Sequence, residues 1–254
     1  MNALALGVDH LNTAVEDVRG VAGVLTDKLG LAVVVPYSEY PAFVTIGLSV
    51  GTSTLFIDRS DTVFFLRPTS PARWRALSLR PAAAPQELAR ELTTRGLSND
   101  GAQEYRQGDD LLWTNVFVTD VLPADEVVFF TQYSAALDEQ VRAAHEGFLS
   151  GGGGALGVTG LAEVGIGGGA GPWNALLDKP VTAADADVYL LADGAQVRLL
   201  ADGPAGLRYI ALRVADLDAA VVALADSGLS SSRDGRYLRI DSEQLDGLDL
   251  RLCT

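Results

Sequence analysis

The stretch "LRYIALRVADLDAAVVALADSGL", residues 207–229, repeats the pattern of "DHLNTAVEDVRGVAGVLTDKLGL", residues 9–31. In both stretches, an apolar run typical of a strand leads into apolar residues at helical spacing, and a glycine marks the helix end. After the first stretch come three strand-like runs separated by Pro and Gly: "LAVVVPYSEY", "AFVTIGLSV" and "STLFID". The pattern therefore predicts a βαβββ module, in the order strand, helix, strand, strand, strand.

The same order recurs, so that four modules are expected at residues 1–60, 72–134, 157–203 and 206–254. One module buries only one face of its sheet, and two must therefore pair. The sequence predicts an α+β fold with two cupped domains, 1–134 and 157–254, each with an eight-stranded mixed sheet. Residues 135–156 between them predict a helix, "ALDEQVRAAHEGFL", and then "SGGGGALG", whose consecutive glycines favour a hinge or an exposed spacer.

Composition excludes several functional classes. The formal net charge of −14 disfavours nucleic acid as a partner, because a phosphate backbone would repel this surface. The single cysteine, Cys253, permits neither an internal disulfide nor a thiolate-rich metal site. No apolar run approaches the ~20 residues that span a bilayer, and no signal peptide is recognised. We expect a cytoplasmic protein, monomeric or homodimeric, with a small-molecule partner and no membrane.

Two segments carry a family resemblance. "VDHLNTAVEDVRGVAGVLTDKLGL" and "LLWTNVFVTDVLPADEVVFFTQY", the latter followed by "GVTGLAEVGIGG", resemble the vicinal oxygen chelate superfamily and its glyoxalase-like branch. That superfamily includes glyoxalases, bleomycin-resistance proteins and extradiol dioxygenases. The resemblance implies the cupped fold over nearly the whole chain. It implies no single activity, because one fold carries many chemistries.

The resemblance also implies where a metal would bind. Metal-using members place a ligand on the first and last strands of each module, typically His, Glu or Gln, which suits Fe, Mn, Zn or Ni. In the first domain these positions fall on His10, Phe56, Arg75 and Gln132. Only His10 and Gln132 match the ligand types, and an arginine would repel the cation. We expect no metal site and no cofactor, with a divalent metal as the alternative.

Polar residues of the first cup are candidates for binding or catalysis. His10 is a candidate acid/base, since imidazole changes charge near neutral pH, or it is a satisfied polar group in the cup wall. Arg75 and Gln132 are expected to face His10 and to hold an anion. The alternative is that Arg75 points outward and pairs with a surface acid. Asn12 shares the face of His10, and His145 is expected at the surface.

Aromatic residues of the same domain are candidates for ligand binding. Tyr105, Trp113, Phe129 and Phe56 would make the cup apolar and suited to a flat ligand. Such residues in strands also serve as plain core. Both interpretations stay open here.

The second domain carries a charged set at the corresponding positions. Glu163 and Tyr209 occupy the first-strand positions, and Arg198 and Arg251 occupy the last-strand positions. This set could bind an anionic ligand, or it could form a closed ion-pair network that supports the second cup.

Three functional classes follow. The first is a glyoxalase-like protein of the binding or resistance type, which holds a small aromatic or polyketide-like molecule in a cup with a degenerate metal site. The second is an enzyme of the same superfamily. It would be a metal-free isomerase, cyclase or lyase that uses His10, or a divalent-metal lyase or dioxygenase. The third is a structural module without a ligand.

Overall fold

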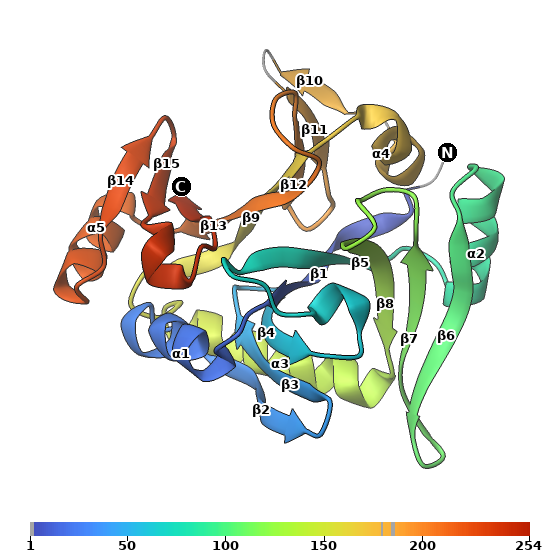
Figure 1. The fold of residues 1–254 in the computed structure, drawn as a ribbon, viewed down its shortest axis with the longest axis horizontal. Coiled ribbons are helices and arrows are strands. Elements are labelled where there is room, and N and C mark those ends of the chain that lie inside the picture. The colour runs from blue at the N-terminus through green and yellow to red at the C-terminus, as the bar shows by residue number, and fades with distance from the viewer. Residues whose placement is uncertain (1–2, 179, 184–185) are drawn as a thin grey trace.

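Two eight-stranded mixed sheets form the fold, as the repeats predict. The computed structural model describes residues 3–178, 180–183 and 186–254. In Figure 1 the second sheet, coloured yellow to red, lies above the first, coloured blue to green.

The first sheet has the order β2-β3-β4-β1-β5-β8-β7-β6, so the two modules join where β1 pairs antiparallel with β5. Its strands are β1 Ala5–Ala14, β2 Val33–Tyr40, β3 Phe43–Ser49, β4 Thr54–Ser60, β5 Arg73–Pro81, β6 Asn99–Gln107, β7 Asp110–Val118 and β8 Val127–Tyr133. Within each module the first and last strands are parallel, β1 with β4 and β5 with β8.

The second sheet repeats this plan in the order β10-β11-β12-β9-β13-β16-β15-β14. Its strands are β9 Val158–Gly167, β10 Val181–Ala183, β11 Ala186–Leu190, β12 Gln196–Leu200, β13 Gly206–Val214, β14 Ser231–Asp234, β15 Tyr237–Ile240 and β16 Leu250–Cys253. The α+β class and the two cupped sheets of the sequence prediction are confirmed.

Each module has a helix after its first strand. These are α1 Val18–Gly23, continued by a π-helical turn over Val24–Lys28, then α2 Pro85–Thr94, α4 Ala170–Leu177 and α5 Leu217–Asp226. Asp17 and Asp216 cap α1 and α5 by accepting hydrogen bonds from first-turn N–H groups. No helix in the described part of the chain is long and apolar enough to span a bilayer.

The main core lies between the sheets and these helices. In the first sheet, Leu11 of β1 and Leu77 of β5 are fully buried and belong to one cluster with Leu25 and Leu88 of the helical layer. Because strand side chains alternate, the residues between these apolar positions lie on the opposite, concave face. That face is called the first cup below.

The two halves of the molecule are tightly packed against each other. The Val8 N–H donates to Asp193 Oδ2 at 3.0 Å, and the Leu207 N–H donates to Glu126 Oε2 at 2.6 Å. Gly51 has a φ of +98°, and a Cβ there would lie 2.4 Å from the Cα of Gly160. The close contact between the halves therefore requires glycine at this point.

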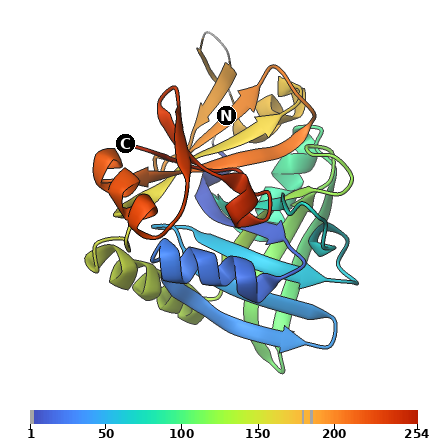
Figure 2. The same ribbon diagram turned by 60° about the vertical axis from the view of Figure 1, so that its left-hand side comes forward.

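The segment between the sheets contains the expected helix, α3 Ala135–Ser150, which contacts β2, β3 and β8. It runs behind the first sheet in Figure 1 and beside α1 in Figure 2. Gly151, Gly152 and Gly154 after it are exposed, but the run is held by hydrogen bonds and close contacts. Gly153 donates to the Phe148 carbonyl and accepts from the Val158 N–H, and a Cβ on Gly154 would overlap the Gly30 carbonyl. These glycines build tight turns against the first half.

Candidate functional site

Strand register determines which side chains share the first cup. His10 of β1 pairs with Thr54 of β4 and with Ser78 of β5, so these three lie on one face. The other cup residues follow by alternation along each strand, and they are Asn12, Phe56, Asp58, Ala76, Tyr105, Trp113, Asn115, Phe117, Phe129, Thr131 and Tyr133.

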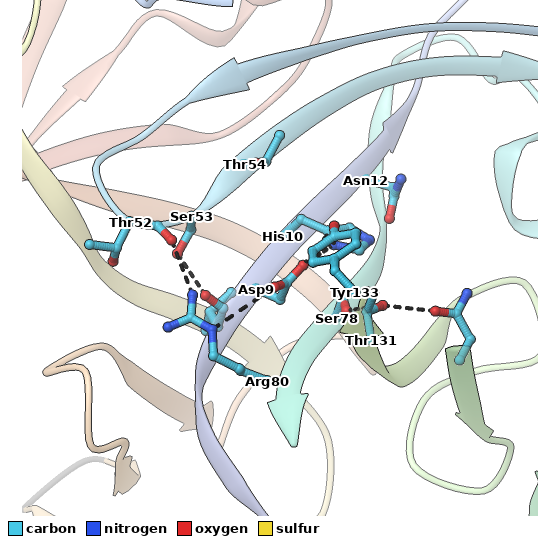
Figure 3. A network of polar contacts seen from close by, with 12 residues as sticks. Asp9, His10, Asn12, Thr52, Ser53, Thr54, Ser78, Arg80, Thr131 and Tyr133 are labelled. Atoms are coloured by element: carbon cyan, nitrogen blue, oxygen red, sulfur yellow. Dashed lines mark hydrogen bonds and ion pairs between the residues drawn. The ribbon is translucent and has the colours of Figure 1, made fainter. Parts of the chain in front are cut away.

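A β-bulge brings His10 into contact with the residue before it. The pairing with β5 slips between Val8 and His10, so Asp9 is the extra residue of β1. Asp9 Oδ1 lies 2.6 Å from His10 Nδ1 (Figure 3). The Tyr133 hydroxyl donates to the same Oδ1 at 3.0 Å, and Arg80 Nε lies 4.0 Å from the other carboxylate oxygen. Asp9 therefore has three partners, and sequence reasoning missed it because the bulge is invisible in an alternating pattern.

This contact orients the imidazole. A carboxylate at Nδ1 favours the tautomer with hydrogen on Nδ1, which leaves Nε2 as an acceptor. Among the described residues, no protein group hydrogen-bonds to Nε2. The edges of Phe56 and Phe129 pack against the ring, at 5.1 and 5.2 Å between centroids. His10 therefore has Nε2 available as an acceptor in a fixed orientation between aromatic rings, and 7% of the residue is exposed to solvent.

Tyr133 supports this arrangement as a neutral phenol. Burial raises the pKa of Tyr133 well above its ordinary value, and the charge of Asp9 raises it further. The hydroxyl consequently keeps its proton and remains a donor to Asp9.

Asn12 lies in the first cup as predicted, and it contacts a carboxylate that the sequence analysis did not single out. Asn12 Nδ2 donates to Asp58 Oδ2 at 2.7 Å. Asp58 has no exposed surface, and burial raises its pKa to about 6. The sequence did contain a signal for Asp58. It is the acid of "TLFID", and it lies two residues after Phe56 and therefore on the same face of β4.

Arg75 does not face His10. It lies at a register shift, where Thr13 pairs with Trp74 and Asn12 with Ala76, so alternation does not fix its direction. Its guanidinium forms an ion pair with Asp125 and donates to Thr69 Oγ1 at 3.3 Å. The sequence analysis gave as its alternative that Arg75 points outward and pairs with a surface acid. Asp125 is such an acid, but Arg75 itself is buried, with 5% of its surface exposed.

Gln132 is exposed and lies on the face opposite His10. Its neighbours Thr131 and Tyr133 are the cup residues at this end of β8. Thr131 Oγ1 bonds to Ser78 Oγ and donates to Asn115 Oδ1, both at 2.9 Å (Figure 3). The sequence analysis assigned the cup position to Gln132, but the structure places Thr131 there. A shift of one residue along a strand moves a side chain to the opposite face.

Aromatic side chains form much of the cup wall. Tyr105 and Trp113 are stacked at 5.4 Å, and Phe117 and Phe129 at 5.1 Å between centroids. Phe65, from the connection between β4 and β5, packs on the latter pair. Tyr105 is 36% exposed and Phe129 only 4%, so the first pair lies at the surface and the second lies in the interior.

His145 is buried, which contradicts the expected surface position. Its Nδ1 lies 2.7 Å from Ser49 Oγ and its Nε2 lies 3.2 Å from Thr54 Oγ1. Burial lowers the pKa of His145, which favours the neutral ring. Both ring nitrogens have protein partners, so His145 joins α3 to the first sheet.

In the second cup, Glu163 is at the centre of a network of polar contacts. Glu163 is 1% exposed and accepts from Arg198 Nε at 2.9 Å, from the Tyr209 hydroxyl at 2.5 Å and from Arg236 at 2.5 Å. The Tyr237 hydroxyl is a fourth donor. Burial alone would raise the pKa of Glu163, but these donors outweigh it and the pKa lies below its ordinary value.

Arg251 stands beside this network without contacting Glu163. It pairs with Asp249 through two hydrogen bonds of 3.0 and 2.9 Å, and its guanidinium lies 3.7 Å from the centre of the Tyr209 ring. The predicted set of Glu163, Arg198, Tyr209 and Arg251 is thus close together. Two further residues complete this network, Arg236 in the turn before β15 and Tyr237 at the start of β15. The sequence analysis missed both.

The first cup does not fit the divalent metal that the resemblance implies. His10 is the only side chain with an imidazole or charged group at a ligand position. Thr54, Ser78 and Phe129 stand at the facing positions of the neighbouring strands, and Phe56 and Thr131 lie two residues further along β4 and β8. Hydroxyl groups and a phenyl ring are poor ligands for Fe, Mn, Zn or Ni. In the described ranges, no three His, Cys, Asp or Glu side chains gather to form a metal site.

Comparison with known proteins gives fold matches only. No family model and no curated protein sequence matches the chain. A solved mutant of 4-hydroxymandelate synthase from Streptomyces coelicolor matches with a TM-score of 0.64 and 15% identity, over 98% of this chain and 92% of that one. A 2,3-dioxygenase from Pseudomonas sp. KL28 matches with a TM-score of 0.67 and 12% identity, over 98% and 92%.

A third similar structure is homoprotocatechuate 2,3-dioxygenase from Brevibacterium fuscum. It matches with a TM-score of 0.64 and 14% identity, over 99% of this chain and 72% of that one. At such identities the likeness concerns the fold alone. The chain has the vicinal oxygen chelate fold, built from four βαβββ modules in two pairs.

Proposed function

We propose that the first cup binds a small aromatic molecule without a metal ion, as in a glyoxalase-like protein of the binding or resistance type. The supporting observation is that two stacked aromatic pairs, Tyr105 with Trp113 and Phe117 with Phe129, lie on this face, with the polar pair Asn115 and Thr131 between them. A flat ligand stacked on such rings gains both apolar burial and favourable ring geometry.

The first cup is the better candidate of the two. The corresponding centre of the second cup is occupied by the Glu163 carboxylate, which already has four donors. A ligand there would have to displace a buried ion-pair network, and breaking such a network costs about 3–5 kcal/mol. We therefore assign the second cup a structural role.

The test is a fluorescence titration with 1-naphthalenemethanol, a neutral flat probe. Wild-type protein should bind it, and Phe56→Ala should weaken binding because Phe56 packs on the His10 ring. Leu190→Ala, a truncation of an exposed residue of the second sheet, is the control and should leave binding unchanged. Equal affinity in all three proteins would contradict the proposal. Absence of binding would favour the structural module without a ligand.

A second candidate is favoured by the contact between Asp9 and His10. A metal-free isomerase, cyclase or lyase of the same superfamily would use His10 Nε2 to take or give a proton, with the tautomer fixed by Asp9. For this candidate, His10→Ala should abolish turnover of a bound substrate and keep its affinity. If wild-type protein binds the molecule without converting it, and His10→Ala weakens that binding, the result would support the binding protein instead.

A further inference from the structure

Asp58 differs from the other carboxylate of the first cup in having no ion pair with a neighbouring side chain, although the charge of His10 acts on it from a distance. Asp9 has Arg80, His10 and Tyr133 around it. Asp58 is fully buried, and no Lys, Arg or His in the described part of the chain forms an ion pair with it. A buried carboxylate without a positive partner costs free energy, and either a proton or a bound cation removes that cost.

The hydrogen bonds around Asp58 leave acceptors unused. Its Oδ2 accepts from Asn12, while its Oδ1 has no partner. Asn12 Oδ1 is also buried without a partner among the described residues. Thr45 of β3 stands opposite Asp58, and its buried hydroxyl is a donor that lowers the pKa of Asp58. Asn12 Oδ1 can only accept, so the partner it lacks is a hydrogen-bond donor.

Aromatic rings stand next to these two acceptors. Phe56 pairs with Asn12 across β1 and β4, and it lies on the face of Asp58 two residues along β4. Phe65 and Phe129 belong to the neighbouring cluster on the same face. The faces of such rings attract cations, and the attraction is stronger where water is excluded.

The connection from β4 to β5 covers this end of the cup. Its one-turn helix Phe64–Leu66 contacts β1, β4 and β5, and Leu66 is buried. The segment has no strand partner of its own over residues 61–72. Asn12 keeps only 8% of its surface exposed, so binding of a ligand at Asp58 would require this connection to shift.

We propose that the ligand of the first cup carries a protonated nitrogen on a flat ring system, and that this group donates to Asp58 and Asn12. The inference rests on the proposed function, because it assumes that the first cup binds an aromatic molecule. It adds the charge and hydrogen-bonding class of that molecule. The rings of Phe56 and Phe129 would flank the cation, and the carboxylate would neutralise it.

The experiment compares three probes with one ring system: 1-naphthylmethylammonium, 1-naphthalenemethanol and 1-naphthoate. Wild-type protein should bind the ammonium at least about 10-fold more tightly than the alcohol, which corresponds to one charge-assisted hydrogen bond. The naphthoate should bind most weakly. Asp58→Asn should remove the preference for the ammonium and leave the affinity for the alcohol within about 2-fold.

Asp61→Asn is the matched control. It removes the same charge three residues along the chain, at an exposed position, and it should keep the preference for the ammonium. A loss of preference in both variants would mean that the general negative charge of the protein attracts the probe, and it would overturn the assignment to Asp58.

The pH dependence tests the same point without a variant. The affinity for the ammonium should fall as the pH drops from 7 to 5, because protonation removes the charge of Asp58, whereas the affinity for the alcohol should stay level. The charged group that acts on Asp58 is His10, which lowers the pKa of the carboxyl and so opposes the effect of burial. Equal binding of all three probes would overturn the inference and leave the proposed function intact. No binding of the alcohol and ammonium would overturn both.

Discussion

Asp9 Oδ1 and His10 Nδ1 are 2.6 Å apart, although the two residues are neighbours in one strand. In a regular strand their side chains would point to opposite faces. The bulge in β1 removes that constraint, and Tyr133 from β8 secures the carboxylate.

The first prediction concerns this pair. Asp9→Asn should change the tautomer of His10, since an amide can either accept from Nδ1 or donate to it, and the carboxylate can only accept. Nitrogen-15 NMR of the imidazole should show one tautomer, with hydrogen on Nδ1, in wild type and a mixture in the variant. Tyr133→Phe should have a smaller effect, as it leaves Asp9 in place. Identical imidazole spectra in wild type and Asp9→Asn would contradict the role given to Asp9.

The second prediction concerns Asp58 and stability. The folded-state pKa of about 6 lies above the ordinary value of 3.8, so the folded protein holds this proton more tightly than the unfolded chain does. The free energy of unfolding should therefore fall as the pH rises from about 4 to about 6, by on the order of 3 kcal/mol. Asp58→Asn should be more stable than wild type at pH 8 and about equal at pH 4. Urea unfolding at both values measures this, and a variant less stable at pH 8 would refute it.

Glu126 provides the third prediction. Burial raises the pKa of Glu126 to about 7, and its carboxylate accepts from the Leu207 N–H of the second half. Because the folded-state pKa is raised, stability should fall as the pH rises through the range from about 4.5 to about 7. Glu126→Gln keeps an acceptor for Leu207 and removes the titration. Its thermal unfolding should depend less on pH than that of wild type, and equal slopes would show that Glu126 does not titrate in this range.

The fourth prediction concerns the closed centre of the second cup. Glu163→Ala should destabilise the protein by about 3 kcal/mol, because the largely buried Arg198 loses its carboxylate partner, while the half-exposed Arg236 is solvated by water. Acetate should restore part of this stability by occupying the vacated position, and chloride at equal concentration should not. Differential scanning fluorimetry gives the comparison. A Glu163→Ala variant with wild-type stability would contradict the structural role of the network.

The fifth prediction separates backbone strain from close packing. Gly51→Ala and Gly96→Ala both place a side chain at positive φ, +98° and +78° respectively. Only at Gly51 would the Cβ meet a neighbour, the Cα of Gly160 at 2.4 Å, since nothing lies within 4 Å at Gly96. Gly96→Ala should cost about 1 kcal/mol of backbone strain, and Gly51→Ala should cost clearly more. Equal losses in the free energy of unfolding, measured by chemical denaturation, would mean that the two halves can separate slightly at Gly51.

The sequence by itself determined the modules and their pairing. A strand that alternates, a helix with a 3.6-residue period and a terminal glycine are local patterns, and they recur at residues 9–31 and 207–229. The same local reading placed His10 and Asn12 on one face of a first strand, as the structure has them. Position along one strand is local information.

Tertiary structure decided which residues from other elements meet His10. Gln132 and Thr131 differ by one position, and only the register with β7 and β5 shows that Thr131 faces the cup. The bulge at Asp9 brings this residue beside His10, and the register shift at Arg75 leaves its direction unspecified by alternation. Asp58 and His145 find their partners 46 and 91 or more residues away. Because a strand alternates with a period of two, an error of one residue exchanges core for cup, and no local pattern carries that register.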